Sequence, residues 1–192
     1  MYISHTFYRL LIVISFLFIS VSLLAEPTLE EVVVSARKVD ESVQDVPIAM
    51  SVFTASDIDD AGIERPEDFI ALTPNVVMAN TVNVGDTLVT IRGLTSTRDA
   101  ESNFAFVVDG VLQTNPNAFN RELLDIAQIE VLKGPQGALY GRNATSGAIL
   151  ITTKAPSEES ESTAVVGMGI NNSSKLQYVN SGMMGDNVYT RF

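Results

Sequence analysis

Cysteine is absent from the 192 residues of this chain, and the single histidine is His5. Without cysteine the protein can form neither disulfide bonds nor thiolate metal sites. His5 lies in a segment that is argued below to be removed, so the mature chain would contain no histidine. Ser–His–Asp and Cys–His catalysis and the usual zinc sites are then excluded. We therefore expect no catalytic residues, no metal site and no cofactor.

Basic residues are also few, with 12 Lys and Arg against 23 Asp and Glu, which gives a formal net charge of -11. A chain of this sign repels nucleic acid and anionic surfaces unless cations intervene. We expect no nucleic-acid partner, and ordinary solubility explains most of the charge. Hydrophobic residues make up 46% of the chain, which is enough to bury a core.

The first 25 residues have the layout of an export signal. Arg9 precedes an apolar run, Leu10 to Leu24, which is interrupted only by serines and ends at Ala25. This three-part pattern is typical of a secretory signal peptide with cleavage after Ala25. The run is shorter than the roughly 20 residues that a membrane-spanning helix needs. Residues 1–25 are therefore predicted to be a signal peptide.

Residues 26–42 are predicted to be a flexible segment. They are short and charged at both ends, and their one apolar island is Val32-Val33-Val34. Three β-branched residues favour an extended backbone. Because no partner strand is evident nearby, this stretch is expected to be a mobile tail.

Residues 43–156 have the signals of a compact domain in which short strands and helices alternate. A helix is expected between a cap at Thr54 or Ser56 and a stop at Gly62. A second helix is expected from Pro66 to the residue before Pro74. Alternating or β-branched runs predict strands at residues 48–53, 87–91, 104–108, 111–112, 126–132 and 148–153.

The composition changes after Pro156. An acidic linker, Ser157 to Glu161, leads into alternating small or polar and apolar residues over Thr163 to Ile170. Lys175 to Met184 then runs back, and a further strand is expected at the C-terminus. Residues 161–192 have room for about three membrane strands of roughly 10 residues each.

Several stretches, taken in order, resemble the TonB-dependent outer-membrane receptor family. Each is weak alone, but six in sequence behind an export signal are specific. They are Glu30 to Ala36, which resembles a TonB box, and then Val46 to Phe53, Ile91 to Gly93, Val108 to Val111, Ile129 to Pro135 and Leu139 to Ile151.

The resemblance implies an α/β (α+β) plug domain with a small mixed sheet and short helices, lodged inside a barrel of about 22 strands. Residues 161–192 would then be the first strands of an incomplete transmembrane barrel, and the chain a fragment of a longer receptor. The location implied is the outer membrane of a Gram-negative bacterium. The activity implied is import of a scarce nutrient, chiefly a ferric siderophore and in some members cobalamin or a glycan. TonB, with ExbB and ExbD, would energise the import.

The resemblance also implies three sets of site residues. TonB would bind the TonB box by strand addition, although a disordered leader with a chance valine run is the alternative. Charges at strand ends would contact the barrel wall, or would simply be solvated. Polar loops would contact the nutrient, or would be ordinary surface loops. The TonB-binding residues are Glu31, Val32, Val33, Val34, Ser35 and Ala36; the plug–barrel contacts are Arg92, Glu130 and Arg142; the ligand candidates are Asn80, Asn83, Thr95, Ser96, Thr97, Arg98, Asn115 and Asn117.

Two other functions stay open on the sequence alone. One is a freestanding periplasmic plug-like module that binds or signals without transport. The other is a hydrolase that uses Asp57, Asp59 and Glu64. No base or cleft is evident beside these carboxylates, so a non-enzymatic role is expected.

Overall fold

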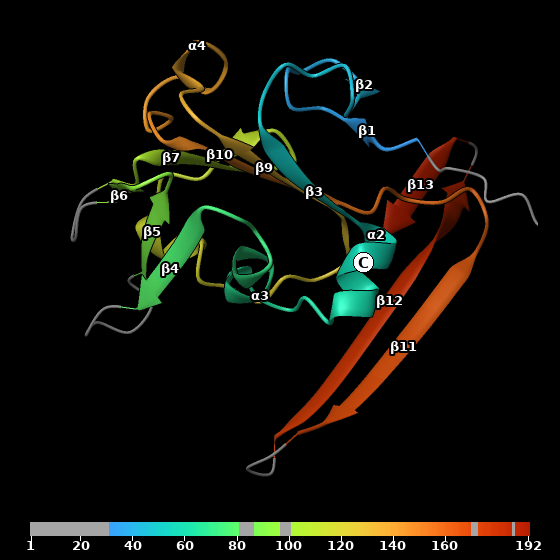
Figure 1. Cartoon of the computed structure of the whole chain (residues 1–192). Coiled ribbons are helices and arrows are strands. Elements are labelled where there is room, and N and C mark those ends of the chain that lie inside the picture. Colours follow the sequence, from blue (N-terminus) through green and yellow to red (C-terminus); the bar gives the residue numbers. More distant parts are fainter. Residues whose placement is uncertain (1–30, 81–86, 97–100, 170–172, 186) are drawn as a thin grey trace, which may run out of the picture. The chain divides into compact units, whose positions relative to one another are not determined.

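The structure is a computed structural model that describes residues 31–80, 87–96, 101–169, 173–185 and 187–192 (Figure 1). The chain divides into two units after Glu31, and the account below concerns Val32–Phe192. The predicted export signal, residues 1–25, lies outside the described residues.

The central element is a five-stranded sheet in which the strand order is β3-β9-β10-β7-β8. β7 and β10 pair in parallel, whereas the other neighbours are antiparallel. The sheet is therefore mixed, as the family resemblance implies. Its strands are β3 (Met50–Thr54), β7 (Phe104–Val108), β8 (Val111–Leu112), β9 (Ile126–Lys133) and β10 (Gly147–Thr153).

Short helices and a second sheet surround these strands. Helix α2 (Ala55–Ala61) begins at a capping box, in which Thr54 and Asp57 bond each other's backbone amides, and ends at Gly62 in the left-handed conformation. Pro66 occupies the first turn of α3 (Pro66–Ala71). The other elements are the antiparallel sheet of β4 (Val76–Asn80), β5 (Thr87–Ile91) and β6 (Leu94–Thr95), the 3-10 turn η2 (Pro116–Ala118) and α4 (Gly137–Tyr140).

Each face of the central sheet carries its own hydrophobic core. Side chains alternate along β9, so Ile129 and Val131 enter the first core while Leu132 enters the second. The first core also takes residues from both helices, from β4 and β5, and from edge-to-face phenylalanines around Phe119. The second core contains Val34 and Ala36, from the segment that precedes the sheet.

The last strands form a separate antiparallel sheet, β11-β12-β13. They are β11 (Glu161–Met168), β12 (Ser174–Gly185) and β13 (Val188–Arg191). Within the described chain neither β11 nor β13 pairs with a further strand, so this sheet is open. Many of its large apolar side chains are exposed, including Met168, Leu176 and Met184.

No helix among the described residues is both long and apolar enough to cross a membrane. In the same part of the chain, no three His, Asp or Glu side chains are grouped so that they could hold a metal ion.

Candidate functional site

The predicted TonB box is paired with a neighbouring strand. β1 (Val33–Val34) runs antiparallel to β2 (Glu41–Ser42), and the Val43 amide donates to the Val32 carbonyl at 3.0 Å. The expectation of a mobile tail without a partner strand therefore differs from the structure. The partner was missed because β2 is two residues long and polar, so it has no periodicity to find.

The same segment covers the second face of the central sheet. Val34 is 1% exposed and Ala36 0%, whereas Val33 on the opposite side of the strand is 48% exposed. This alternation is that of a strand with one buried face. The segment is therefore part of the folded domain in this structure.

Three side chains of the plug bind the backbone of this segment. Glu130 Oε1 accepts hydrogen bonds from the Ser35 amide at 3.0 Å and the Ser35 hydroxyl at 3.3 Å. Gln128 Nε2 donates to the Val33 carbonyl at 2.9 Å, and the Tyr140 hydroxyl donates to the Ala36 carbonyl at 2.8 Å. Gln128 and Tyr140 were not among the predicted site residues, because nothing in the sequence indicates which residues lie opposite the segment.

Glu130 itself is 1% exposed, and the structure contains no hydrogen-bond partner for its Oε2 among the described residues. Burial raises the pKa of Glu130, and the hydrogen bonds from Ser35 partly oppose this rise. Burial and the negative charge of Glu130 together raise the pKa of Tyr140 to about 12. Glu130 was predicted to contact the barrel wall. That contact stays a prediction; in this structure the place of Glu130 on β9 turns it into the second core, where it faces the N-terminal segment.

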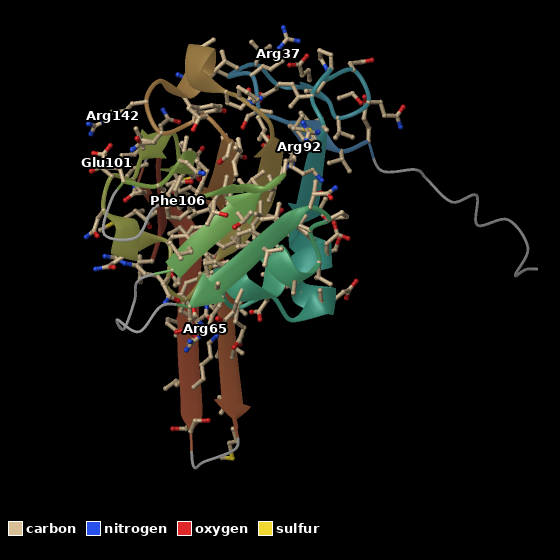
Figure 2. All side chains as sticks on the ribbon, turned by 60° about the vertical axis from the view of Figure 1, so that its left-hand side comes forward. Arg37, Arg65, Arg92, Glu101, Phe106 and Arg142 are labelled. Carbon is tan, nitrogen blue, oxygen red and sulfur yellow. The ribbon has the colours of Figure 1, made fainter. Side chains whose placement is uncertain are left out.

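The other two predicted plug–barrel contacts lie at the surface. The Arg142 guanidinium is 3.3 Å from a Glu101 carboxylate oxygen, and both side chains are largely exposed (Figure 2). Arg92 has no carboxylate within ion-pair distance in the described part of the chain. Burial and the positive charge of Arg92 lower the pKa of the neighbouring Lys133. Arg92 and Lys133 are therefore two neighbouring positive charges. Only Arg92 was among the predicted site residues.

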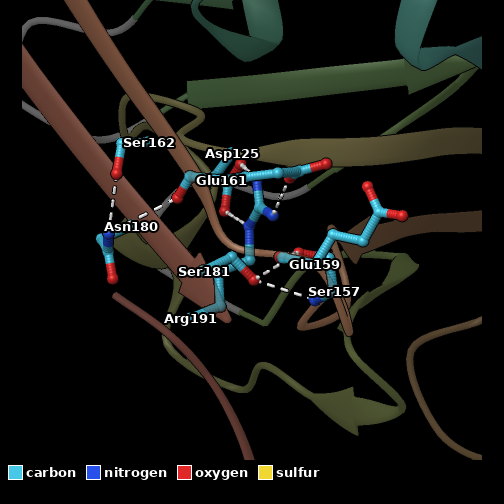
Figure 3. Close-up of polar contacts among 8 residues, drawn as sticks. All are labelled: Asp125, Ser157, Glu159, Glu161, Ser162, Asn180, Ser181 and Arg191. Atoms are coloured by element: carbon cyan, nitrogen blue, oxygen red, sulfur yellow. Dashed lines mark hydrogen bonds and ion pairs between the residues drawn. The ribbon is translucent and has the colours of Figure 1, made fainter. Parts of the chain in front are cut away.

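Ion pairs that the sequence did not reveal join the plug to the C-terminal sheet. Arg191 on β13 binds the Asp125 carboxylate through two nitrogens, one of them at 2.7 Å, and also approaches Glu161 at 3.5 Å (Figure 3). Lys175 on β12 lies 3.0 Å from carboxylate oxygens of both Glu64 and Glu122. Hydrogen bonding to Arg191 lowers the pKa of Asp125. These contacts bring together residues that are far apart in sequence, so local patterns could not show them.

Described residues just before β7, just after β8 and just before β10 meet at the end of the central sheet where β7 and β10 begin. Ser102, Gln113, Thr114, Asn115 and Asn143 line one small pocket there. Asn80, Thr95 and Asn117 are exposed. The Asn115 side chain accepts a hydrogen bond from the Asn117 amide at 3.0 Å. Asn83, Thr97 and Arg98 lie outside the described residues.

Ser96 differs from the other ligand candidates. It is 6% exposed, and its hydroxyl is hydrogen-bonded to the Val89 carbonyl at 3.1 Å and to Asn103 Oδ1 at 2.8 Å. In this structure the Ser96 hydroxyl therefore holds the loop, and its contact with a ligand stays a prediction.

The fold is that of the plug of an outer-membrane receptor, as solved structures show. The ferric yersiniabactin uptake receptor FyuA from Yersinia pestis superposes with a TM-score of 0.68 at 28% identity, over 74% of this chain and 23% of that one. The ferripyoverdine receptor of Pseudomonas aeruginosa superposes with a TM-score of 0.71 over 83% of this chain and 21% of that one. Its identity of 20% supports the fold alone.

Residues 42–148 match the family described as the TonB-dependent Receptor Plug Domain, and the chain belongs to this family. Its relatives include the pesticin receptor of Yersinia pestis, which is 30% identical over 65% of this chain. The vitamin B12 transporter BtuB of Vibrio vulnificus is 28% identical over 86% of this chain. The chain spans 19% and 27% of the length of these two relatives. The expected family and plug fold are confirmed.

Proposed function

We propose that this chain supplies the export signal, the TonB-binding segment, the plug and the first barrel strands of an outer-membrane receptor that imports a scarce nutrient. The observation that carries the proposal is the family match over 42–148, together with the short strand Val33–Val34 that lies shortly before it in the chain. The open sheet β11-β12-β13 fits the start of a barrel wall, because its exposed apolar residues suit contact with lipid.

The proposed nutrient is a ferric siderophore complex. Relatives named as a ferric yersiniabactin uptake receptor and as iron-regulated outer membrane virulence protein support iron as the cargo. The relative named as a vitamin B12 transporter makes cobalamin the alternative cargo. The exposed amide and hydroxyl groups of Asn80, Thr95 and Asn117 suit hydrogen bonding to a polar ligand of either kind.

TonB, with ExbB and ExbD, is the proposed source of energy, and the Val33 edge of β1 is the proposed contact. In the β1–β2 pair the Val43 amide bonds the Val32 carbonyl, and Val34 pairs with Glu41. Hydrogen-bonded and non-bonded pairs alternate in antiparallel ladders. The backbone amide of Val33 therefore points away from β2, towards an edge that a TonB strand could occupy. Arg92, with Lys133, and Arg142 are the proposed contacts to acidic residues of the barrel wall.

The export proposal predicts a mature N-terminus near Glu26. Arg9 and the apolar run behind it should direct secretion, and a signal peptidase should cut after Ala25. Mass spectrometry of the exported protein tests this. Recovery of exported protein with an intact Met1 would contradict it.

The transport proposal predicts uptake by a full-length receptor that carries this plug. In cells that lack other siderophore receptors, it should import radioactive ferric siderophore but not labelled cobalamin. Replacing Thr95 and Asn117 together by alanine should weaken nutrient binding about tenfold, because two polar contacts of about 0.5–1.5 kcal/mol each are lost.

Thr152→Ala is the matched control, because Thr152 is an exposed threonine at the opposite end of β10. Its binding curve should equal that of the unchanged receptor. Uptake of cobalamin alone would contradict the siderophore proposal, and identical curves for all three receptors would contradict the assignment of the loops.

A further inference from the structure

In the described part of the chain, Glu130 places a buried carboxylate in the second core, on β9 between β3 and β10. Its strand neighbours in register are Val52 on β3 and Leu150 on β10, and neither can pair with a charge. The segment that covers it provides the Ser35 amide and hydroxyl, both of which bond Oε1. These hydrogen bonds of Glu130 therefore depend on this segment.

Burying the Glu130 carboxylate under this segment costs free energy. Removing an ionised group from water is unfavourable unless hydrogen bonds or opposite charges replace the water. Here both hydrogen bonds reach one oxygen, and Oε2 is left without a partner in the described residues. Glu130 thus orients Ser35 through two hydrogen bonds. The free-energy cost of burying its carboxylate at the same time weakens the binding of the segment Val32–Ala36 to the plug.

The attachment also covers the edge that TonB would need. The Val33 carbonyl, which lies on that edge, is occupied by Gln128 Nε2 at 2.9 Å. A strand cannot be added there until this contact opens. Residues 32–36 must therefore separate from the plug before a partner can bind them in an extended form.

We infer that Glu130 is the positioning residue that sets how readily the segment Val32–Ala36 leaves the plug, and thereby how accessible it is to TonB. The consequence for TonB rests on the proposed function of this segment. The control of release by Glu130 rests on the hydrogen bonds and the burial alone.

The binding of the segment Val32–Ala36 to the plug is expected to depend on pH, because its contacts surround the ionisable Glu130. The Asp40 carboxylate opposes ionisation of Glu130, and Tyr140 is a neutral phenol with Lys38 lying 5.7 Å above its ring. Arg37 is paired with Glu41 at 3.3 Å. The pKa of Glu130 is raised while the segment covers it and returns towards its ordinary value on release. Docking is therefore strongest at acidic pH and weakens as the pH rises through the raised pKa.

Thiol labelling measures release directly, because the chain has no cysteine of its own. Val34→Cys places a reporter that is 1% exposed under the segment, and Val89→Cys places one that is 0% exposed in the first core. Labelling at position 34 reports release or unfolding, whereas labelling at position 89 reports unfolding alone. Rates are measured on the purified chain and divided by those of a free thiol at the same pH.

Glu130→Ala should accelerate labelling at position 34 about tenfold and leave position 89 unchanged, since the hydrogen bonds to the charged group are lost. Glu130→Gln keeps an acceptor for the Ser35 amide without the charge. It should slow labelling at position 34 at neutral pH and remove its dependence on pH. In the unchanged protein, labelling at position 34 should rise from acidic to neutral pH.

Equal labelling at position 34 in all three proteins would overturn the inference, and so would equal acceleration at positions 34 and 89 together with no effect of Glu130→Gln. TonB binding is measured separately, with a synthetic peptide of residues 31–36 and the periplasmic domain of TonB. If the peptide does not bind while the labelling behaves as expected, the TonB proposal fails and the role of Glu130 stands.

Discussion

Proline at position 33 is expected to reduce TonB binding at least about tenfold while leaving the plug folded. The Val33 amide points away from β2, so its loss does not break the β1–β2 pair. A TonB strand added at that edge would lose the backbone donor and meet the proline ring. The loss of TonB binding thus has a cause that is separate from folding. The neighbouring Val34, which lies in the second core, keeps its side chain in this variant.

Val33→Ala is the matched control. It removes the exposed side chain but keeps the amide, so cross-linking to TonB should remain within about threefold of the unchanged level. Cross-linking from position 31 in cells, with the thermal midpoint of each variant as the folding control, gives the measurement. Equal cross-linking for the proline and alanine variants would rule out strand addition at the Val33 edge.

Gly147→Ala is expected to destabilise the plug by about 3 kcal/mol, at the upper end of the usual effect of overpacking a core. An added Cβ at Gly147 would lie 2.3 Å from the Leu132 carbonyl oxygen and 3.2 Å from the Ile91 side chain. The carbonyl belongs to β9, which lies between β3 and β10 in the sheet, and it cannot move without disturbing both pairs.

Gly137→Ala provides the contrast, because a Cβ added at Gly137 would meet no atom within 4 Å and α4 begins at this residue. Alanine should be neutral or stabilising by up to about 1 kcal/mol at that position. Urea unfolding of the three proteins compares their free energies of unfolding. Equal midpoints for Gly147→Ala and the unchanged protein would show that the sheet can adjust at β10.

The strands and helices of the plug were predictable where local patterns carry the information. The expected strand at 104–108 coincides with β7, and those at 126–132 and 148–153 differ from β9 and β10 by one residue at an end. Of the two expected caps, Thr54 and Ser56, Thr54 is the one that begins α2, and the expected stop at Gly62 ends it. Alternation, capping residues and turn residues act over a few positions, so a single sequence contains them.

The strand β4 and the side-chain partners of Glu130 and Asp125 were not predicted. They depend on contacts between distant parts of the chain. β4 has an exposed valine and ends at Asn80, so it has no clear alternation to mark it as a strand. Glu130 was recognised only as a charge that borders an apolar strand and contacts the barrel wall. Its partner Ser35 lies 95 residues away in sequence, and no local pattern could identify it. The same holds for Asp125 and Arg191, which are 66 residues apart.

The hairpin geometry of β1 and β2 determines how the plug responds to a mechanical load. Val32 and Val43 lie at the open end of this ribbon, opposite its turn, where the Lys38 amide donates to the Ser35 carbonyl. A force that draws Glu31 away from the sheet therefore unzips the ribbon and loads its hydrogen bonds one after another rather than in parallel. The next strand along the chain is β3, at the edge of the five-stranded sheet, where β9 is its one partner among the described strands. Tension would reach that edge strand first, while β9 and β10 remain held from both sides.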